Sequence, residues 1–117
     1  MGQNVLFQKA QYNYINENTK LLTIEEIKEA LQPLCKKYHI QSVILFGSYS
    51  KGNATGESDI DLVVEYDSDT KAFVRMEFMD DVETVFGKKI DFINIRVIPE
   101  MLKNDIEKEG ILLYETI

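Results

Sequence analysis

The sequence has few of the residues that build disulfides and soft-metal sites. Cys35 is the only cysteine among 117 residues, and His39 is the only histidine. A single cysteine cannot form an intrachain disulfide or a thiolate zinc cluster, and a single histidine excludes a multi-histidine metal site. Any divalent cation that this chain binds must therefore have oxygen ligands, which suits Mg²⁺ or Mn²⁺.

The sequence also lacks an apolar run approaching the about 20 residues of a membrane span. Its N-terminus has neither the charged start nor the apolar segment of a signal peptide. Lysine and arginine number 13 against 20 aspartates and glutamates, which gives a formal net charge of −7. Nonspecific nucleic-acid binding relies on lysine and arginine to neutralise phosphates. We therefore expect a cytoplasmic protein with no membrane insertion and no direct DNA binding.

The length and a hydrophobic content of 44% predict one domain with one core. Residues 1–20 are rich in asparagine and glutamine and lack periodicity. We expect a flexible N-terminal arm there, with an arm that docks onto a partner as the alternative. Residues 21–117 are expected to form the single domain.

The hydrophobic pattern of residues 21–117 alternates between helical and strand periodicity. Thr23 and Glu26 form a capping-box pattern at the start of the first helix. In the second helix we expect Phe73, Phe78, Val82, Val85 and Phe86 to be core residues. The order is helix (to Tyr38), strand (42–46), loop (47–57), strand (59–66), helix (70–86), strand (89–95), helix (Pro99 to Gly110) and strand (111–114). Two successive strands followed by alternation predict an α+β fold, a mixed sheet with helices mainly on one face.

Two carboxylates are expected to lie side by side at the second strand. Strand side chains alternate between faces, so Asp59 and Asp61 project the same way while Ile60 projects toward the core. Like charges this close raise each other's affinity for protons unless a cation joins them. The pair is therefore a candidate ligand set for a divalent cation.

Asp91 is the third candidate acid, in a strand that is otherwise apolar except for Asn94. If that strand pairs beside the strand of Asp59 and Asp61, Asp91 joins the same metal cluster or accepts a proton from an attacking hydroxyl. The alternative is an exposed acid next to Lys88 and Lys89 at the start of the strand.

A glycine–serine pair, Gly47 and Ser48, directly follows the first buried strand. Glycine lets the backbone approach a phosphate closely, and amides at a following helical start would point at the phosphate oxygens. Lys51 is a further candidate phosphate contact, with simple solvation as the alternative. Ser58, next to Asp59, is a further candidate nucleotide contact.

Gly47 and Ser48, ten intervening residues, and then Asp59-Ile60-Asp61 resemble the signature of the DNA polymerase β-like nucleotidyltransferases. The longer string from Phe46 to Val64 is similar to the minimal nucleotidyltransferases (MNT). The resemblance implies a mixed sheet with flanking helices, a triphosphate held by Gly47 and Ser48, and two Mg²⁺ ions at Asp59, Asp61 and Asp91. It implies attack of a hydroxyl on the α-phosphate of ATP, with pyrophosphate leaving. Many members have Ala-Arg where this chain has Ser50-Lys51, and lysine keeps the charge but not the bidentate fork.

Stand-alone minimal nucleotidyltransferases resemble antitoxins whose partner is a HEPN-domain ribonuclease toxin. The resemblance implies an enzyme that transfers AMP to a tyrosine of that toxin and so inactivates it. Two alternatives are an antitoxin that acts by binding and occluding the toxin, and a nucleotidyltransferase with a small-molecule or RNA acceptor.

Overall fold

A computed structural model describes residues 21–116, so the predicted arm at residues 1–20 lies outside the described part of the chain. The elements are α2 (Ile24–Lys37), β1 (Ser42–Phe46), α3 (Ser48–Lys51), β2 (Ile60–Glu65), α4 (Ala72–Phe86), β3 (Ile90–Asn94), the 3-10 turn η1 (Ile95–Val97), α5 (Glu100–Glu109) and β4 (Ile111–Glu115). The predicted order is confirmed, and one helical turn, α3, follows β1 directly. No helix in this part of the chain is long and apolar enough to cross a membrane.

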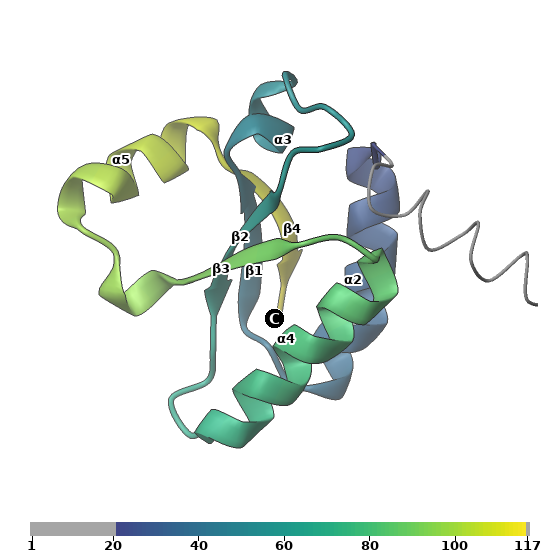
Figure 1. Ribbon diagram of the computed structural model, residues 1–117. Helices are drawn as coiled ribbons and strands as arrows, with labels where there is room; N and C mark the ends of the chain where they lie inside the picture. Colours follow the sequence, from purple (N-terminus) through teal and green to yellow (C-terminus); the bar gives the residue numbers. More distant parts are fainter. Residues whose placement is uncertain (1–20, 117) are drawn as a thin grey trace, which may run out of the picture.

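The four strands form one mixed sheet in the order β3-β2-β1-β4. β1 pairs antiparallel with both β2 and β4, whereas β2 and β3 are parallel. A parallel pair needs a crossover connection, and α4 supplies it between β2 and β3. The predicted mixed sheet and α+β class are therefore confirmed (Figure 1).

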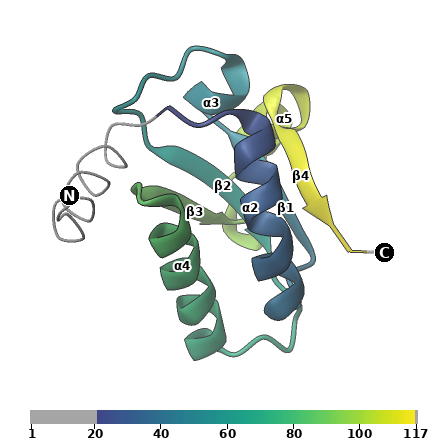
Figure 2. The same cartoon turned by 90° about the vertical axis from the view of Figure 1, so that its right-hand side faces the viewer.

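Helices α2 and α4 lie side by side on one face of the sheet and cover the main core (Figure 2). A capping box starts α2: the Thr23 amide donates to Glu26 Oε1 at 2.8 Å, and the Glu26 amide donates to Thr23 Oγ1 at 3.0 Å. Phe78 of α4 is fully buried and makes edge-to-face contacts with Tyr38, Tyr66 and Phe92. These rings join α2, α4 and the sheet.

Helix α5 lies on the opposite face of the sheet from α2 and α4 (Figures 1 and 2). Ile98 and Ile106 pack there against Val63 of β2 in a second, smaller core. The helices are thus mainly, but not all, on one face. Asp61 also lies on this face of β2, two residues from Val63.

Two of the predicted core residues of α4 are wrong. Phe73 is 61% exposed and Val85 is 50% exposed, whereas Phe78, Val82 and Phe86 are buried as predicted. Helical spacing explains Phe73, because positions 78, 82 and 86 repeat every four residues along one stripe of the helix and Phe73 lies outside it. Val85, seven residues after Phe78, lies at the edge of the stripe, on the side away from Phe86, and is half-exposed there.

Phe78 and Phe73 therefore offer a matched test of this core. Phe78→Ala should lower the free energy of unfolding by about 3–5 kcal/mol, because it leaves a cavity among three other rings. Phe73→Ala should change it by less than about 0.5 kcal/mol, because its ring is mostly in water. Urea denaturation followed by circular dichroism measures both, and equal losses would contradict the described packing of α4.

Candidate active site

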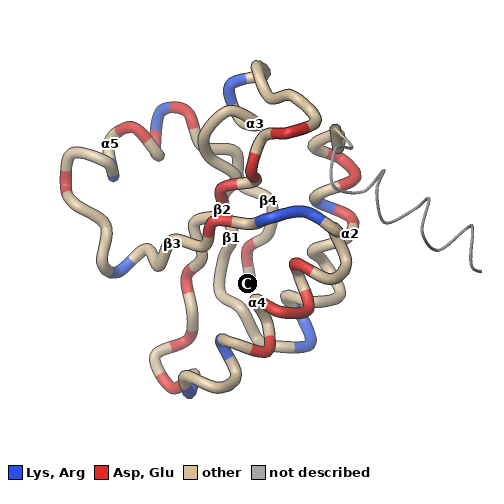
Figure 3. Tube along the Cα trace, viewed as in Figure 1, with Lys and Arg blue, Asp and Glu red and all other residues tan. Residues whose placement is uncertain are grey.

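The parallel pairing of β2 and β3 brings two of the predicted acids together. Asp61 of β2 lies directly opposite Asp91 of β3, and Phe46 of β1 lies on the other side of Asp61. Ile60 and Leu62, the neighbours of Asp61, are fully buried on the other face, as the alternation of the strand requires. Figure 3 shows the acidic positions of β2 and β3 next to each other, beside the basic segment that leads into β3.

The environment of Asp61 favours its protonated form. Burial, a side-chain hydrogen bond with Asp91 and the charges of Asp91 and Asp59 together raise the pKa of Asp61 from 3.8 to about 6, and burial is the largest of these causes. The acidic neighbours of Asp61 therefore raise its pKa, as the sequence predicted, and Asp91 contributes more to this rise than Asp59 does. A cation that joins these oxygens would remove the repulsion.

Gly47 lies against the same carboxylate. A Cβ atom built at Gly47 would be 2.1 Å from Asp61 Oδ2, and Gly47 has φ 76° and ψ −150°, which disfavours any other residue. Glycine is therefore required here for two reasons, space and backbone conformation. The turn that leads into α3 and the acid of β2 are in direct contact.

Ser48 is the first residue of α3, with Gly47 as the N-cap. The first amides of a helix have no partners within it and can donate to an anion. The Ser50 hydroxyl donates to the Gly47 carbonyl at 2.9 Å, and the Lys51 amide donates to the same oxygen at 3.1 Å. These bonds fix the turn, so the amide groups at its start are held next to Asp61.

Asp59 lies just before β2 and is less closely joined to the other acids. Its Oδ2 is 3.9 Å from Lys89 Nζ, and its side chain is 41% exposed. Across residues 21–116, no three histidine, cysteine, aspartate or glutamate side chains converge closely enough to hold a metal ion. Asp61 and Asp91 are thus the pair in contact, and Asp59 would join them by turning from Lys89. The donors are all carboxylate oxygens, which fits Mg²⁺.

Ser58 has a role within its own loop. The Thr55 amide donates to Ser58 Oγ at 2.8 Å, and the Ser58 amide donates to the Thr55 carbonyl at 3.0 Å. Ser58 therefore shapes the segment that carries Asp59, and a nucleotide contact of its hydroxyl stays a prediction.

Lys51 does not point freely into solvent. Its Nζ is 3.6 Å from Glu109 Oε1 and 5.8 Å from the centre of the Phe46 ring. Both groups are half-exposed, so the pair is weakly held and screened. A phosphate contact of Lys51, which stays a prediction, would require this pair to open.

Sequence reasoning missed Lys88. It was named only as a neighbour of Asp91, but it is 6% exposed, and its Nζ donates to the Gly56 carbonyl at 2.7 Å. Burial lowers the pKa of Lys88, and the charge of Asp59 opposes that effect. The signal that could have separated it from the exposed Lys89 is strand alternation, because Lys88 precedes the buried Ile90 by two residues, whereas Lys89 precedes Asp91 by two.

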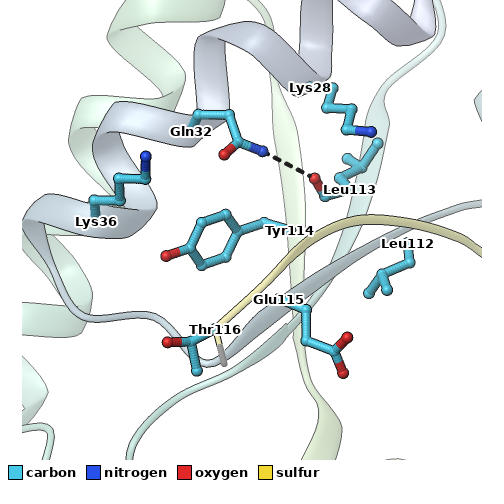
Figure 4. Close-up of a pocket in the computed structure, with 8 residues that line it drawn as sticks. All are labelled: Lys28, Gln32, Lys36, Leu112, Leu113, Tyr114, Glu115 and Thr116. Carbon is cyan, nitrogen blue, oxygen red and sulfur yellow. Dashed lines mark hydrogen bonds between the residues drawn. The ribbon is translucent and has the colours of Figure 1, made fainter.

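A wide cavity of about 570 Å³ lies away from these acids, on the other side of β1 from β2 and β3. Lys28, Gln32 and Lys36 of α2 line it together with residues 112–116 (Figure 4). The Gln32 amide donates to the Leu113 carbonyl at 3.2 Å, so α2 covers part of the β4 edge. None of the predicted site residues lines this cavity.

The geometry agrees with the similarity of the chain to known proteins. Residues 25–116 match the family described as polymerase beta, nucleotidyltransferase. A candidate protein adenylyltransferase of Methanocaldococcus jannaschii is 38% identical over 99 residues, which cover 79% of this chain and 97% of that protein. The chain therefore belongs to the polymerase β nucleotidyltransferase family, and its resemblance to the minimal nucleotidyltransferases is confirmed.

Two solved structures share the fold. A toxin–antitoxin complex with AMP-PNP has a chain with a TM-score of 0.64 and 24% identity, covering 76% of this chain and 73% of that one. A complex of tri-AMPylated Shewanella oneidensis HEPN toxin with MNT antitoxin gives a TM-score of 0.60 and 21% identity, covering 80% and 74%. At these identities the two structures support the fold alone.

Gly47 and Gly52 provide a matched test of the turn. Both have positive φ, but a Cβ at Gly52 meets no atom within 4 Å. Gly52→Ala should therefore cost only the backbone strain, about 1 kcal/mol. Gly47→Ala should cost more and should also displace Asp61, which weakens binding of Mn²⁺ with AMP-PNP. Calorimetric titration and urea denaturation check this, and equal binding by the two variants would contradict the contact.

The raised pKa of Asp61 predicts how stability depends on pH. Its proton stabilises the fold below the unfolded pKa of 3.8, and this contribution is lost as the pH rises through about 6. In chelator-treated protein, Asp61→Asn should raise the melting temperature by about 3 °C at pH 8 and by less at about pH 5.5. Added Mg²⁺ should then stabilise the wild type at pH 8 but not the variant. An equal shift at both pH values would be inconsistent with this pKa.

Proposed function

We propose that this chain is an antitoxin that transfers AMP from ATP to a tyrosine of a HEPN ribonuclease toxin. The observation that carries the proposal is the position of Asp61, which contacts Asp91 on one side and Gly47 on the other. One nucleotide can then be held by the turn at Gly47 while its α-phosphate lies at the acids. Family membership and the names of the relatives support the choice of adenylyl transfer.

The residues of the site have separate roles in the transfer. The amides after Gly47, together with Ser48, hold the β- and γ-phosphates, because a helix start favours anions. Asp91 takes the proton of the attacking tyrosine hydroxyl. The tyrosine oxygen then forms a bond to the α-phosphorus, the bond from that phosphorus to the bridging oxygen breaks, and pyrophosphate leaves with the electron pair.

Asp59 and Asp61 would hold Mg²⁺, together with Asp91. When bound, the cation supplies charge stabilisation at the attacking and departing oxygens. The contribution of the chain is to keep Asp61 between Gly47 and Asp91, and to keep Asp59 within reach at the start of β2. Because the pKa of Asp61 is raised to about 6, this carboxyl takes up a proton at a higher pH than an ordinary aspartate, and a bound cation would oppose that.

The choice of a HEPN toxin as acceptor rests on the similar complexes. One of them contains an AMPylated HEPN toxin with its MNT antitoxin, and the other contains AMP-PNP. A transferred AMP adds bulk and negative charge, which would oppose RNA binding by the toxin. The proposal thus explains neutralisation by a lasting chemical change.

Incubation with a cognate HEPN toxin, labelled ATP and Mg²⁺ tests the transfer. We expect label on the toxin, located on a tyrosine by mass spectrometry. Asp61→Asn and Asp59→Asn should each lower transfer at least about a hundredfold, because they remove metal ligands. Asp91→Asn should lower kcat more than it weakens ATP binding. Asp105→Asn, an exposed acid on α5, is the matched control and should transfer normally.

The three acids do not converge on one point within residues 21–116. This favours a second candidate function, in which the chain neutralises the toxin by binding and occluding it. An Asp59→Asn plus Asp61→Asn variant distinguishes the two in a ribonuclease assay. Full neutralisation by this variant, with no label transferred by the wild type, would replace adenylyl transfer with occlusion. Loss of neutralisation together with loss of label would support the enzyme.

A further inference from the structure

Lys88 is the only buried charged residue in the part of the chain that the structure describes. An ammonium group out of water is costly unless polar partners surround it. Other basic residues of the site are easier to explain: the side chain of Lys89 is 72% exposed, and that of Lys51 is 45% exposed. The burial of Lys88 therefore requires a reason in the structure around it.

The contacts of Lys88 lead to the segment that carries Asp59. Its Nζ donates to the carbonyl of Gly56, in the connection between α3 and β2. In that segment Thr55 and Ser58 bond to each other, which closes it into a compact turn before Asp59. On the other side of Asp59, the Ile60 amide donates to the Lys89 carbonyl at 3.2 Å. The entry to β3 thus holds the entry to β2 on both sides of Asp59.

We propose that Lys88 is a positioning residue for the transfer: it holds the segment 53–58 through Gly56, and so fixes the backbone of Asp59 at the start of β2, within reach of Asp61 and Asp91. This inference rests on the proposed function, because it concerns the acids that would bind the cation. Lys88 touches neither the nucleotide nor the acceptor. It acts through the backbone that carries Asp59.

Lys88 and Lys89 differ in what happens when a cation binds. Lys89 is exposed and 3.9 Å from Asp59, so solvent screens the pair and a divalent cation can displace it. Lys88 is bonded to a backbone carbonyl at 2.7 Å and keeps that bond whichever way the Asp59 side chain turns. Asp59 is therefore free to rotate while its backbone stays in place, which is what a ligand that closes on a cation needs.

Lys88→Met tests this role, because it keeps the length of the side chain but removes the donor and the charge. Lys28→Met, at an exposed lysine of α2, is the matched control and should behave as the wild type. We expect Lys88→Met to lower kcat at least about tenfold while KM for ATP stays within about threefold, because the turn at Gly47 is untouched. Its melting temperature should stay within about 5 °C, because a buried ammonium is itself costly.

Two further measurements separate positioning from general stability. Amide hydrogen exchange of residues 55–60 should be faster in Lys88→Met than in Lys28→Met, while exchange in α2 stays equal. Lys88→Arg keeps a donor and the charge and should recover at least about a third of the wild-type kcat. If Lys88→Met does not fold, Lys88→Leu, which also lacks a donor, replaces it, and wild-type kcat in that variant would overturn the proposal.

The failure of this inference differs from the failure of the proposed function. If the wild type transfers AMP and a folded Lys88→Met variant has the same kcat, the positioning role is wrong and the function stands. If the wild type transfers no AMP, Mn²⁺ titration and amide hydrogen exchange still test the positioning role of Lys88. Equal Mn²⁺ affinity and equal exchange at residues 55–60 in Lys88→Met and Lys28→Met would reject the role, and weaker binding with faster exchange would support it.

Discussion

The carboxylate of Asp61 occupies the space that any side chain at position 47 would need. This contact joins the turn before α3 to β2, and the parallel register then joins β2 to Asp91. A phosphate held by the turn is therefore close to the acids without any further domain. Helices α2 and α4 bury one face of the sheet, and Ile98 and Ile106 pack against Val63 on the other face.

Three acids at the ends of two neighbouring strands repel one another, and two features of the domain reduce this repulsion. Asp61 takes up a proton at a higher pH than an ordinary aspartate, because burial and Asp91 raise its pKa. Asp59 is near two lysines, one exposed and one buried. Within residues 21–116 the three acids are near one another but do not converge on one point. Binding of a cation would replace the exposed lysine as the counter-charge of Asp59.

The sequence was sufficient for most of the fold because its local signals agree with its packing. The capping box at Thr23 and the apolar strands were predicted and are present. The alternation of side chains along β2 correctly placed Asp61 on the opposite face of the sheet from the buried Ile60 and Leu62. Phe73 was misplaced because size and hydrophobicity suggested a core residue, whereas the position on the helix decides burial. The partner of Lys88 could not be predicted, because it is a backbone carbonyl of a distant segment, which leaves no pattern along the chain.

The crossover through α4 has a consequence for the order in which the site is completed. Gly47, Asp59 and Asp61 come early in the chain, whereas Asp91 and Lys88 follow the helix that makes β2 and β3 parallel. A chain still emerging from the ribosome holds the first acids but lacks the strand that pairs with them. The complete set of acids would thus come together only late in synthesis, when β3 can pair with β2.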